Sequence, residues 1–146
     1  MAKILRKSDR IKLGLGEVTV EVAPLSFHER TEVQLAMHES AKSGDTMGVI
    51  KATFLCVKYA VKGISGVELS DGSKYKLELE DGMLTDECVN DLFSLEQSDK
   101  LSLVCINLLQ GKYKDFVDPS TGEKIKGVKI LSKEKPAKKP KRIAGS

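Results

Sequence analysis

The chain has 146 residues and a mass of 16.0 kDa, the size of a single domain. Hydrophobic residues make up 40% of it and there is no tryptophan, so aliphatic side chains must form most of the core. The formal net charge of +3 is uneven: residues 132–146 carry six cations and one Glu, or 6 − 1 = +5, which leaves 3 − 5 = −2 for residues 1–131. A slightly acidic body argues against a broad nucleic-acid-binding face, because such faces are strongly basic.

The three cysteines, Cys56, Cys88 and Cys105, lie in apolar stretches and lack Cys-x-x-Cys spacing. This pattern is typical of small buried hydrophobic side chains in a reducing compartment, not of a disulfide scaffold. No apolar run of signal-peptide length follows the charged N-terminus. No segment approaches the ~18 apolar residues of a membrane span. We therefore expect a soluble, cytoplasmic protein without contact to membranes.

Residues 10–22 predict a β-hairpin, because apolar and polar residues alternate with a period of two on both sides of a glycine-containing turn. The apolar positions are Ile11, Leu13, Val18, Val20 and Val22, and the turn is Gly14-Leu15-Gly16. This segment is not a dinucleotide-binding loop, because a strand follows it where that motif needs a helix.

A first helix is predicted from Ser26, which has capping-box spacing to Glu29, to about Ser43, where Gly44 stops it. Its apolar positions are few, so we expect it to be half exposed; they are Phe27, Val33, Ala36 and Met37.

A second helix is predicted after Asp45, a plausible cap. Its apolar residues recur at intervals of three and four, which places them on one face: Met47, Ile50, Phe54, Val57 and Val61. Gly63 is expected to end this helix in a left-handed conformation, with Ile64 folding back on the last turn.

A second hairpin is predicted from residues 67–69 and 75–79, joined around Asp71-Gly72. A third helix should open at Thr85 and bury Cys88, Val89, Leu92 and Phe93. A fourth helix should end at Gly111 and bury Leu101, Val104, Cys105, Leu108 and Leu109.

Residues 114–117 and 123–131 flank a loop rich in turn residues and predict a third, loosely packed hairpin. From Ser132 onward the chain has no apolar period and consists mainly of Lys, Pro and Ala, so this tail should be disordered when alone. The prediction is therefore a single α+β domain over residues 1–131, with about four helices packed with two or three antiparallel hairpins, and a basic tail over residues 132–146.

No constellation in the sequence indicates catalysis, a cofactor or a metal site. His28 and His38 would stand about 15 Å apart along one helix, too far to share a metal ion. The acidic residues from Glu78 to Glu87 lack the ligand spacing of a calcium loop. Nothing resembles an activated nucleophile. We expect a protein that is not an enzyme.

The tail admits three interpretations: an inert solubilising segment, a nucleic-acid-binding arm, or a peptide that docks on a partner. Its cations include Lys138, Lys139, Lys141 and Arg142, which we take as candidate partner-binding residues. With no aromatic residue to stack on bases, binding to nucleic acid should be weak at most.

Four segments stand out in chain order: Pro24-Leu25-Ser26-Phe27 with Glu29 at a helix start, Ser43-Gly44-Asp45, Val61-Lys62-Gly63-Ile64-Ser65-Gly66, and Asn107-Leu108-Leu109-Gln110-Gly111. With these segments, the order of elements resembles the tail assembly chaperones of long-tailed bacteriophages over about residues 15–111. The hairpin around Pro119 and the basic tail lie outside this range. The resemblance implies a non-enzymatic factor in the host cytoplasm that binds the tape measure protein, recruits tail tube subunits and self-associates.

Partner binding is expected from the first helix, with Val33 and Met37 partly exposed, and from an unpaired strand edge at Val22. The alternatives are a structural protein of the virion, in the tail, baseplate or connector, and an accessory protein associated with nucleic acid.

Overall fold

The structure, a computed structural model, describes residues 4–44, 47–112, 116–119 and 121–134. Within them the chain forms four helices, a four-stranded sheet and a two-stranded sheet, which confirms the predicted α+β class. In chain order the elements are β1 (Arg10–Leu15), β2 (Val18–Val22), α1 (Phe27–Ser43), α2 (Met47–Ala60), β3 (Val61–Ser65), β4 (Leu79–Glu80), β5 (Met83–Leu84), α3 (Asp86–Leu92), α4 (Ser98–Leu109) and β6 (Val128–Glu134).

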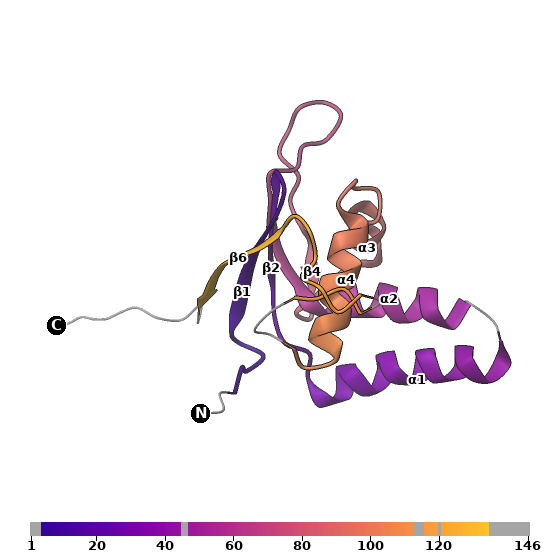
Figure 1. Cartoon of the computed structure of the whole chain (residues 1–146). Coiled ribbons are helices and arrows are strands. Elements are labelled where there is room, and N and C mark those ends of the chain that lie inside the picture. Colours follow the sequence, from indigo (N-terminus) through magenta and orange to yellow (C-terminus); the bar gives the residue numbers. More distant parts are fainter. Residues whose placement is uncertain (1–3, 45–46, 113–115, 120, 135–146) are drawn as a thin grey trace.

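The main sheet is antiparallel with the strand order β3-β2-β1-β6. The predicted first hairpin is confirmed: Leu15 pairs with Val18, and Gly16 takes a φ of +74° in the turn. Alternate side chains of β1 and β2 are buried on the face toward the helices, whereas Lys12 on the opposite face is exposed. Figure 1 shows the sheet on one side of the molecule and the helices on the other.

Helix α1 begins with the predicted capping box. Ser26 Oγ accepts a hydrogen bond from the Glu29 backbone N–H at 3.2 Å, and Glu29 Oε1 accepts one from the Ser26 N–H at 3.0 Å. Gly44 ends the helix, also as predicted, and takes the left-handed conformation. The apolar positions differ from expectation at one end, because Phe27 is 84% exposed.

Helix α2 runs without a loop into β3, which corrects the prediction for residues 61–64. Val61 belongs to the strand instead of the helix, and Gly63 pairs with Glu21 in the sheet. The reason is tertiary: the N–H of Ala23 donates to the carbonyl of Ala60 at 2.8 Å, which ties the end of α2 to the end of β2.

The buried face of α2 agrees with the predicted one at Val57 and differs from it in the first half of the helix. Met47 and Ile50 are exposed, and the buried positions begin with Ala52 and Cys56. Small side chains lie inward because α1 and α4 pack closely against this helix.

The predicted second hairpin is reduced to a single bridge between Glu68 and Lys74, with Gly72 at a φ of +87° in its turn. It projects beyond the end of the main sheet (Figure 1). Leu79 pairs with Leu84 in the short β4–β5 hairpin, which the sequence did not predict. Thr85 caps α3 as predicted, through a hydrogen bond from the Cys88 N–H.

The predicted third hairpin is present only as the bridge between Val117 and Lys124. Asn107, which is 1% exposed, holds it by donating to the Val117 carbonyl and accepting from the Val117 N–H. The chain then forms β6, which pairs with β1 and completes the main sheet. This strand continues to Glu134, three residues past the predicted domain boundary at Leu131, because Ser132 to Glu134 pair with the start of β1.

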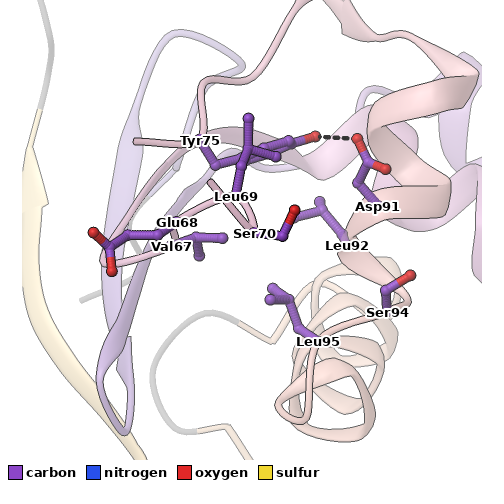
Figure 2. A pocket seen from close by; sticks show the side chains of 9 residues that line it. All are labelled: Val67, Glu68, Leu69, Ser70, Tyr75, Asp91, Leu92, Ser94 and Leu95. Atoms are coloured by element: carbon purple, nitrogen blue, oxygen red, sulfur yellow. Dashed lines mark hydrogen bonds between the residues drawn. The ribbon is translucent and has the colours of Figure 1, made fainter. Parts of the chain in front are cut away.

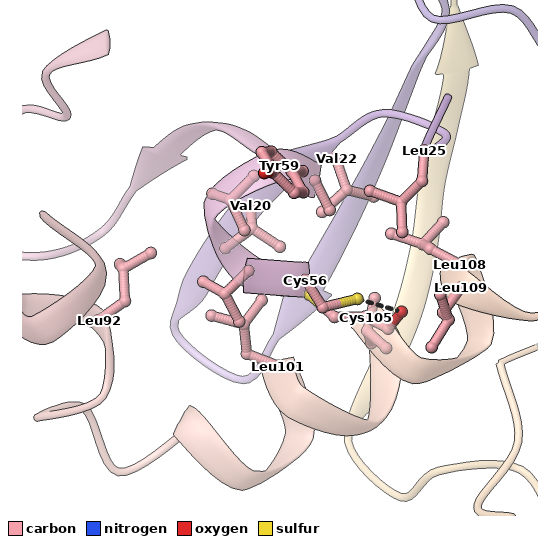
Figure 3. Close-up of a cluster of buried hydrophobic side chains, with 14 of the residues drawn as sticks. Val20, Val22, Leu25, Cys56, Tyr59, Leu92, Leu101, Cys105, Leu108 and Leu109 are labelled. Carbon is pink, nitrogen blue, oxygen red and sulfur yellow. Dashed lines mark hydrogen bonds between the residues drawn. The ribbon is translucent and has the colours of Figure 1, made fainter. Parts of the chain in front are cut away.

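One core lies between the sheet and the helices. Figure 3 shows Val20 and Val22 from β2 facing Leu101 and Leu108 from α4, with Cys56 of α2 between them. The predicted inward face of α4 is confirmed, since all five of its expected apolar residues are buried. Phe93, the C-cap residue of α3, is 37% exposed, which corrects its predicted burial in this helix.

Candidate interaction surfaces

Helices α1 and α2 form an antiparallel pair that extends away from the sheet (Figure 1). They approach most closely at Gly48: a Cβ atom there would lie 2.4 Å from the Ala36 carbonyl oxygen and 2.5 Å from Ser40 Cβ. The absence of a side chain at this position lets the two backbones meet, with Ala36 and Ser40 buried in the contact.

A narrow apolar groove lies where this helix pair meets α4. Its hollow has a volume of about 40 Å³, enough for the tip of one aliphatic side chain. Its walls are almost entirely apolar and come from three helices: Val33, Met37, Val49, Ala52, Thr53, Cys56, Ser102, Ile106 and Leu109.

The helix pair also exposes large apolar side chains beside and beyond the groove. Met37 is 36% exposed and Val49 is 47% exposed at the groove rim, and both are long or branched side chains that water solvates poorly. Three more lie elsewhere on the same two helices: Leu35, Met47 and Ile50. Exposed apolar residues gathered on two neighbouring elements are typical of a protein-binding surface.

A second hollow, of about 290 Å³, lies between the projecting hairpin and α3 (Figure 2). The Tyr75 hydroxyl donates a hydrogen bond to Asp91 Oδ2 at 2.8 Å across it. Burial raises the pKa of Tyr75 well above its ordinary value, so the phenol remains a donor. The residues that line the hollow are Val67, Glu68, Leu69, Ser70, Tyr75, Asp91, Leu92, Ser94 and Leu95.

No family model, curated protein or solved structure matches this chain. The resemblance to tail assembly chaperones therefore remains a prediction from the sequence pattern. The function of the surfaces has to be inferred from the residues that form them.

The structure separates the two helix residues that the sequence singled out for partner binding. Met37 lies at the groove rim, where a partner can reach it. Val33 is 1% exposed, which corrects the expectation that it is partly exposed: its side chain belongs to the core and lines the groove formed with α2 and α4. The four candidate residues of the tail, Lys138, Lys139, Lys141 and Arg142, lie outside the described residues.

The expected strand edge at Val22 is also corrected. β2 is an interior strand, with Val22 paired to Ile11 on one side and to Val61 on the other. The sequence did not predict that β2 is an interior strand, because the segment that forms β3 resembles the end of a helix.

Val49, Ile106 and the Tyr75–Asp91 pair were not singled out from the sequence. A signal was present for Val49: together with Met47 and Ile50 it makes the first turn of α2 apolar on more than one side. One neighbour can cover only one side of a helix, so such a turn indicates a second contact.

The polar groups beside α1 hold helices together. Glu32 accepts a hydrogen bond from the Tyr59 hydroxyl through one carboxylate oxygen, and its other oxygen lies 2.9 Å from His28 Nε2. Burial and the carboxylate of Glu32 raise the pKa of Tyr59 to about 12. A phenol with this pKa stays protonated, so it anchors α1 to α2 and supplies no nucleophile.

The cysteines are buried, as predicted. Cys56 Sγ donates to the backbone carbonyl of Cys105 at 2.9 Å (Figure 3). The neighbouring Cys56 thiol, together with burial, raises the pKa of the Cys105 thiol well above its ordinary value. Reactive thiols need a lowered pKa and access to solvent. Within the described residues no group of three His, Cys, Asp or Glu side chains could hold a metal ion, and no helix has the length and apolar character that a bilayer crossing needs.

Proposed function

We propose that this chain is a non-enzymatic morphogenesis factor of a long-tailed bacteriophage, a tail assembly chaperone that holds the tape measure protein and recruits tail tube subunits. The observation that carries the proposal is the apolar groove at the junction of α1, α2 and α4, together with the partly exposed Met37 and Val49 at its rim. These features fit the amphipathic face of a helical partner, which inserts aliphatic side chains at helical spacing.

The strength of each contact fits a reversible role. The groove hollow of about 40 Å³ accepts the tip of one aliphatic side chain, and each CH2 group buried there contributes about 0.8 kcal/mol. A chaperone must release its partner, so weak single contacts suit it. Repetition of the contact along an elongated partner makes the sum strong through effective concentration.

Substitutions at the groove rim test the proposal. Met37→Glu and Val49→Glu should keep the thermal midpoint near that of the unchanged protein, because both side chains are already partly exposed. They should reduce association, both of the protein with itself and with tape measure fragments, since a carboxylate would have to be desolvated in the groove. Light scattering of the purified protein, alone and with such fragments, measures this.

Phe27→Glu is the matched control, because Phe27 lies on the same helix, is 84% exposed and does not line the groove. Association should survive this substitution. A protein that stays monomeric and ignores tape measure fragments would contradict the chaperone function and favour a structural component of the virion.

A further inference from the structure

The hollow between the projecting hairpin and α3 has the chemistry of a site for a long cationic side chain. Tyr75, Leu92 and Leu95 supply apolar and aromatic surface, and the carboxylates of Glu68 and Asp91 supply negative charge (Figure 2). A Lys or Arg side chain matches this arrangement, because its aliphatic stem packs on apolar surface and its head pairs with a carboxylate.

The residues that line the hollow carry a net negative charge, and Lys74, the bridge partner of Glu68, is outside this lining. The lining contains neither Lys nor Arg, and neither Glu68 nor Asp91 takes part in an ion pair among the described residues. Helix α3 ends beside the hollow and carries no basic residue in its last turn, where a cation would favour the helix dipole. Asp91 uses Oδ2 to accept from Tyr75, which leaves its other oxygen for a ligand.

The hairpin also offers backbone groups beside the hollow. Leu69 N–H donates to Ser73 at 2.8 Å and Tyr75 N–H donates to Val67 at 2.9 Å, so the bridge between Glu68 and Lys74 is of the non-hydrogen-bonded kind. The N–H and C=O of Glu68 therefore point away from Lys74, toward the outer edge of the hairpin. An extended peptide lying along this edge can exchange backbone hydrogen bonds with Glu68 while a side chain enters the hollow.

The chain itself contains a segment of matching chemistry. Residues 135–146 have five cations and no acidic side chain: Lys135, Lys138, Lys139, Lys141 and Arg142. We propose that the hollow formed by Tyr75 and Asp91 binds a Lys or Arg side chain from residues 135–146 of a second copy of this chain.

The topology favours a second copy over the same one. Glu134 pairs with Arg10, whereas the projecting hairpin leaves the sheet after Ser65, which pairs with Thr19 at the opposite end. Four residues along β1 and three strand spacings across the sheet give a straight-line distance of about 20 Å before the path turns to the helix side of the sheet. Arg142, the last cation of the tail, is eight residues after Glu134 and reaches at most about 28 Å at full extension, so within one copy only an almost straight tail could bring a cation to the hollow.

The test uses the full-length chain with Met37→Glu. This substitution blocks binding at the groove, so the association that remains reports on the hollow alone. Sedimentation equilibrium should show association that weakens as salt rises, because charge pairs are screened. Asp91→Lys should weaken it at least tenfold, and so should the triple change of Lys138, Lys139 and Lys141 to Glu. The two sets combined should restore association, because the charges are then exchanged.

Glu80→Lys is the control, since it makes the same change of charge at an exposed residue outside the hollow. It should leave association unchanged, and thermal midpoints should show that every variant is folded. The proposal is overturned if Asp91→Lys associates like its parent, if Glu80→Lys weakens association equally, if the exchange of charges restores nothing, or if the parent is monomeric at all concentrations.

Discussion

Lys62 of β3 is half-buried, with its ammonium group donating to the Gly82 carbonyl oxygen at 2.5 Å. Burial lowers the pKa of Lys62 to about 8, and the charges of Lys7 and Arg10 act in the same direction, while Glu29 opposes them. Folding therefore places this cation among other cations and removes part of its hydration.

The lowered pKa predicts how stability varies with pH. Between pH 8 and 10.5 the unfolded chain binds a proton at Lys62 that the folded chain has lost, so the free energy of unfolding rises with pH across this window. Lys62→Met removes the titration. From pH 8 to pH 10 the thermal midpoint of the unchanged protein should therefore rise by a few degrees relative to that of the variant, after allowance for solvent screening.

Circular dichroism melts of both proteins at each pH measure the difference and cancel all other titrations. A difference that stays constant across the window would contradict the lowered pKa of Lys62.

At the scale of elements, the close contact between α1 and α2 depends on the missing side chain of Gly48. In an exposed helix Gly→Ala gains about 1 kcal/mol. Here the added methyl group would meet the backbone oxygen of Ala36 at 2.4 Å, and backbone cannot move aside as a flexible side chain can. Gly48→Ala should therefore destabilise the protein by about 1–3 kcal/mol, measured by urea denaturation.

Gly14→Ala provides the comparison, because the nearest atom to its new methyl group is a side-chain carbon of Leu131 at 3.8 Å, an ordinary contact. It should change the free energy of unfolding by no more than about 0.5 kcal/mol. Equal effects at Gly14 and Gly48 would show that backbone propensity, not the contact between helices, governs both sites.

At the scale of the whole molecule, one edge strand of the main sheet, β6, comes from the C-terminal part of the chain. Truncation after Leu131 removes the residues that pair with Arg10, Ile11 and Lys12, and should lower the thermal midpoint by about 5 °C. Truncation after Glu134 keeps these pairs, so its midpoint should stay within about 2 °C. Calorimetry at low protein concentration compares the two; equal midpoints would show that the end of β6 adds nothing to stability.

The distribution of charge over the whole molecule predicts weak binding to nucleic acid. Residues 1–131 have a formal charge of −2, so only the tail offers a net positive charge to phosphates. With about six phosphate contacts, affinity should fall roughly a thousandfold between 50 and 200 mM salt. Fluorescence anisotropy with labelled single-stranded and duplex DNA measures it. Tight binding at physiological salt that is abolished by Lys→Ala at Lys138, Lys139 and Lys141 would contradict this expectation.

The sequence by itself determined the features that depend on neighbouring residues. The capping box of Ser26 and Glu29, the left-handed Gly44, the Thr85 cap and the alternation of Val18 to Val22 act over a few bonds, and the structure contains each of them. The inward face of α4 could also be predicted, because its apolar residues recur at helical spacing over three turns.

Only the tertiary structure decided which faces are covered and which strands are neighbours. Val33 and Met37 lie one turn apart on the same side of α1 and both line the groove, but Val33 packs in the core whereas Met37 is at the rim and partly exposed. β3 pairs with the edge of β2 that was predicted to be free, and β6 pairs with β1. The composition of the segment that forms β6 had indicated loose packing. Local sequence preferences do not predict such long-range pairing, because each strand gains its hydrogen bonds and burial only when its partner strand is already in place.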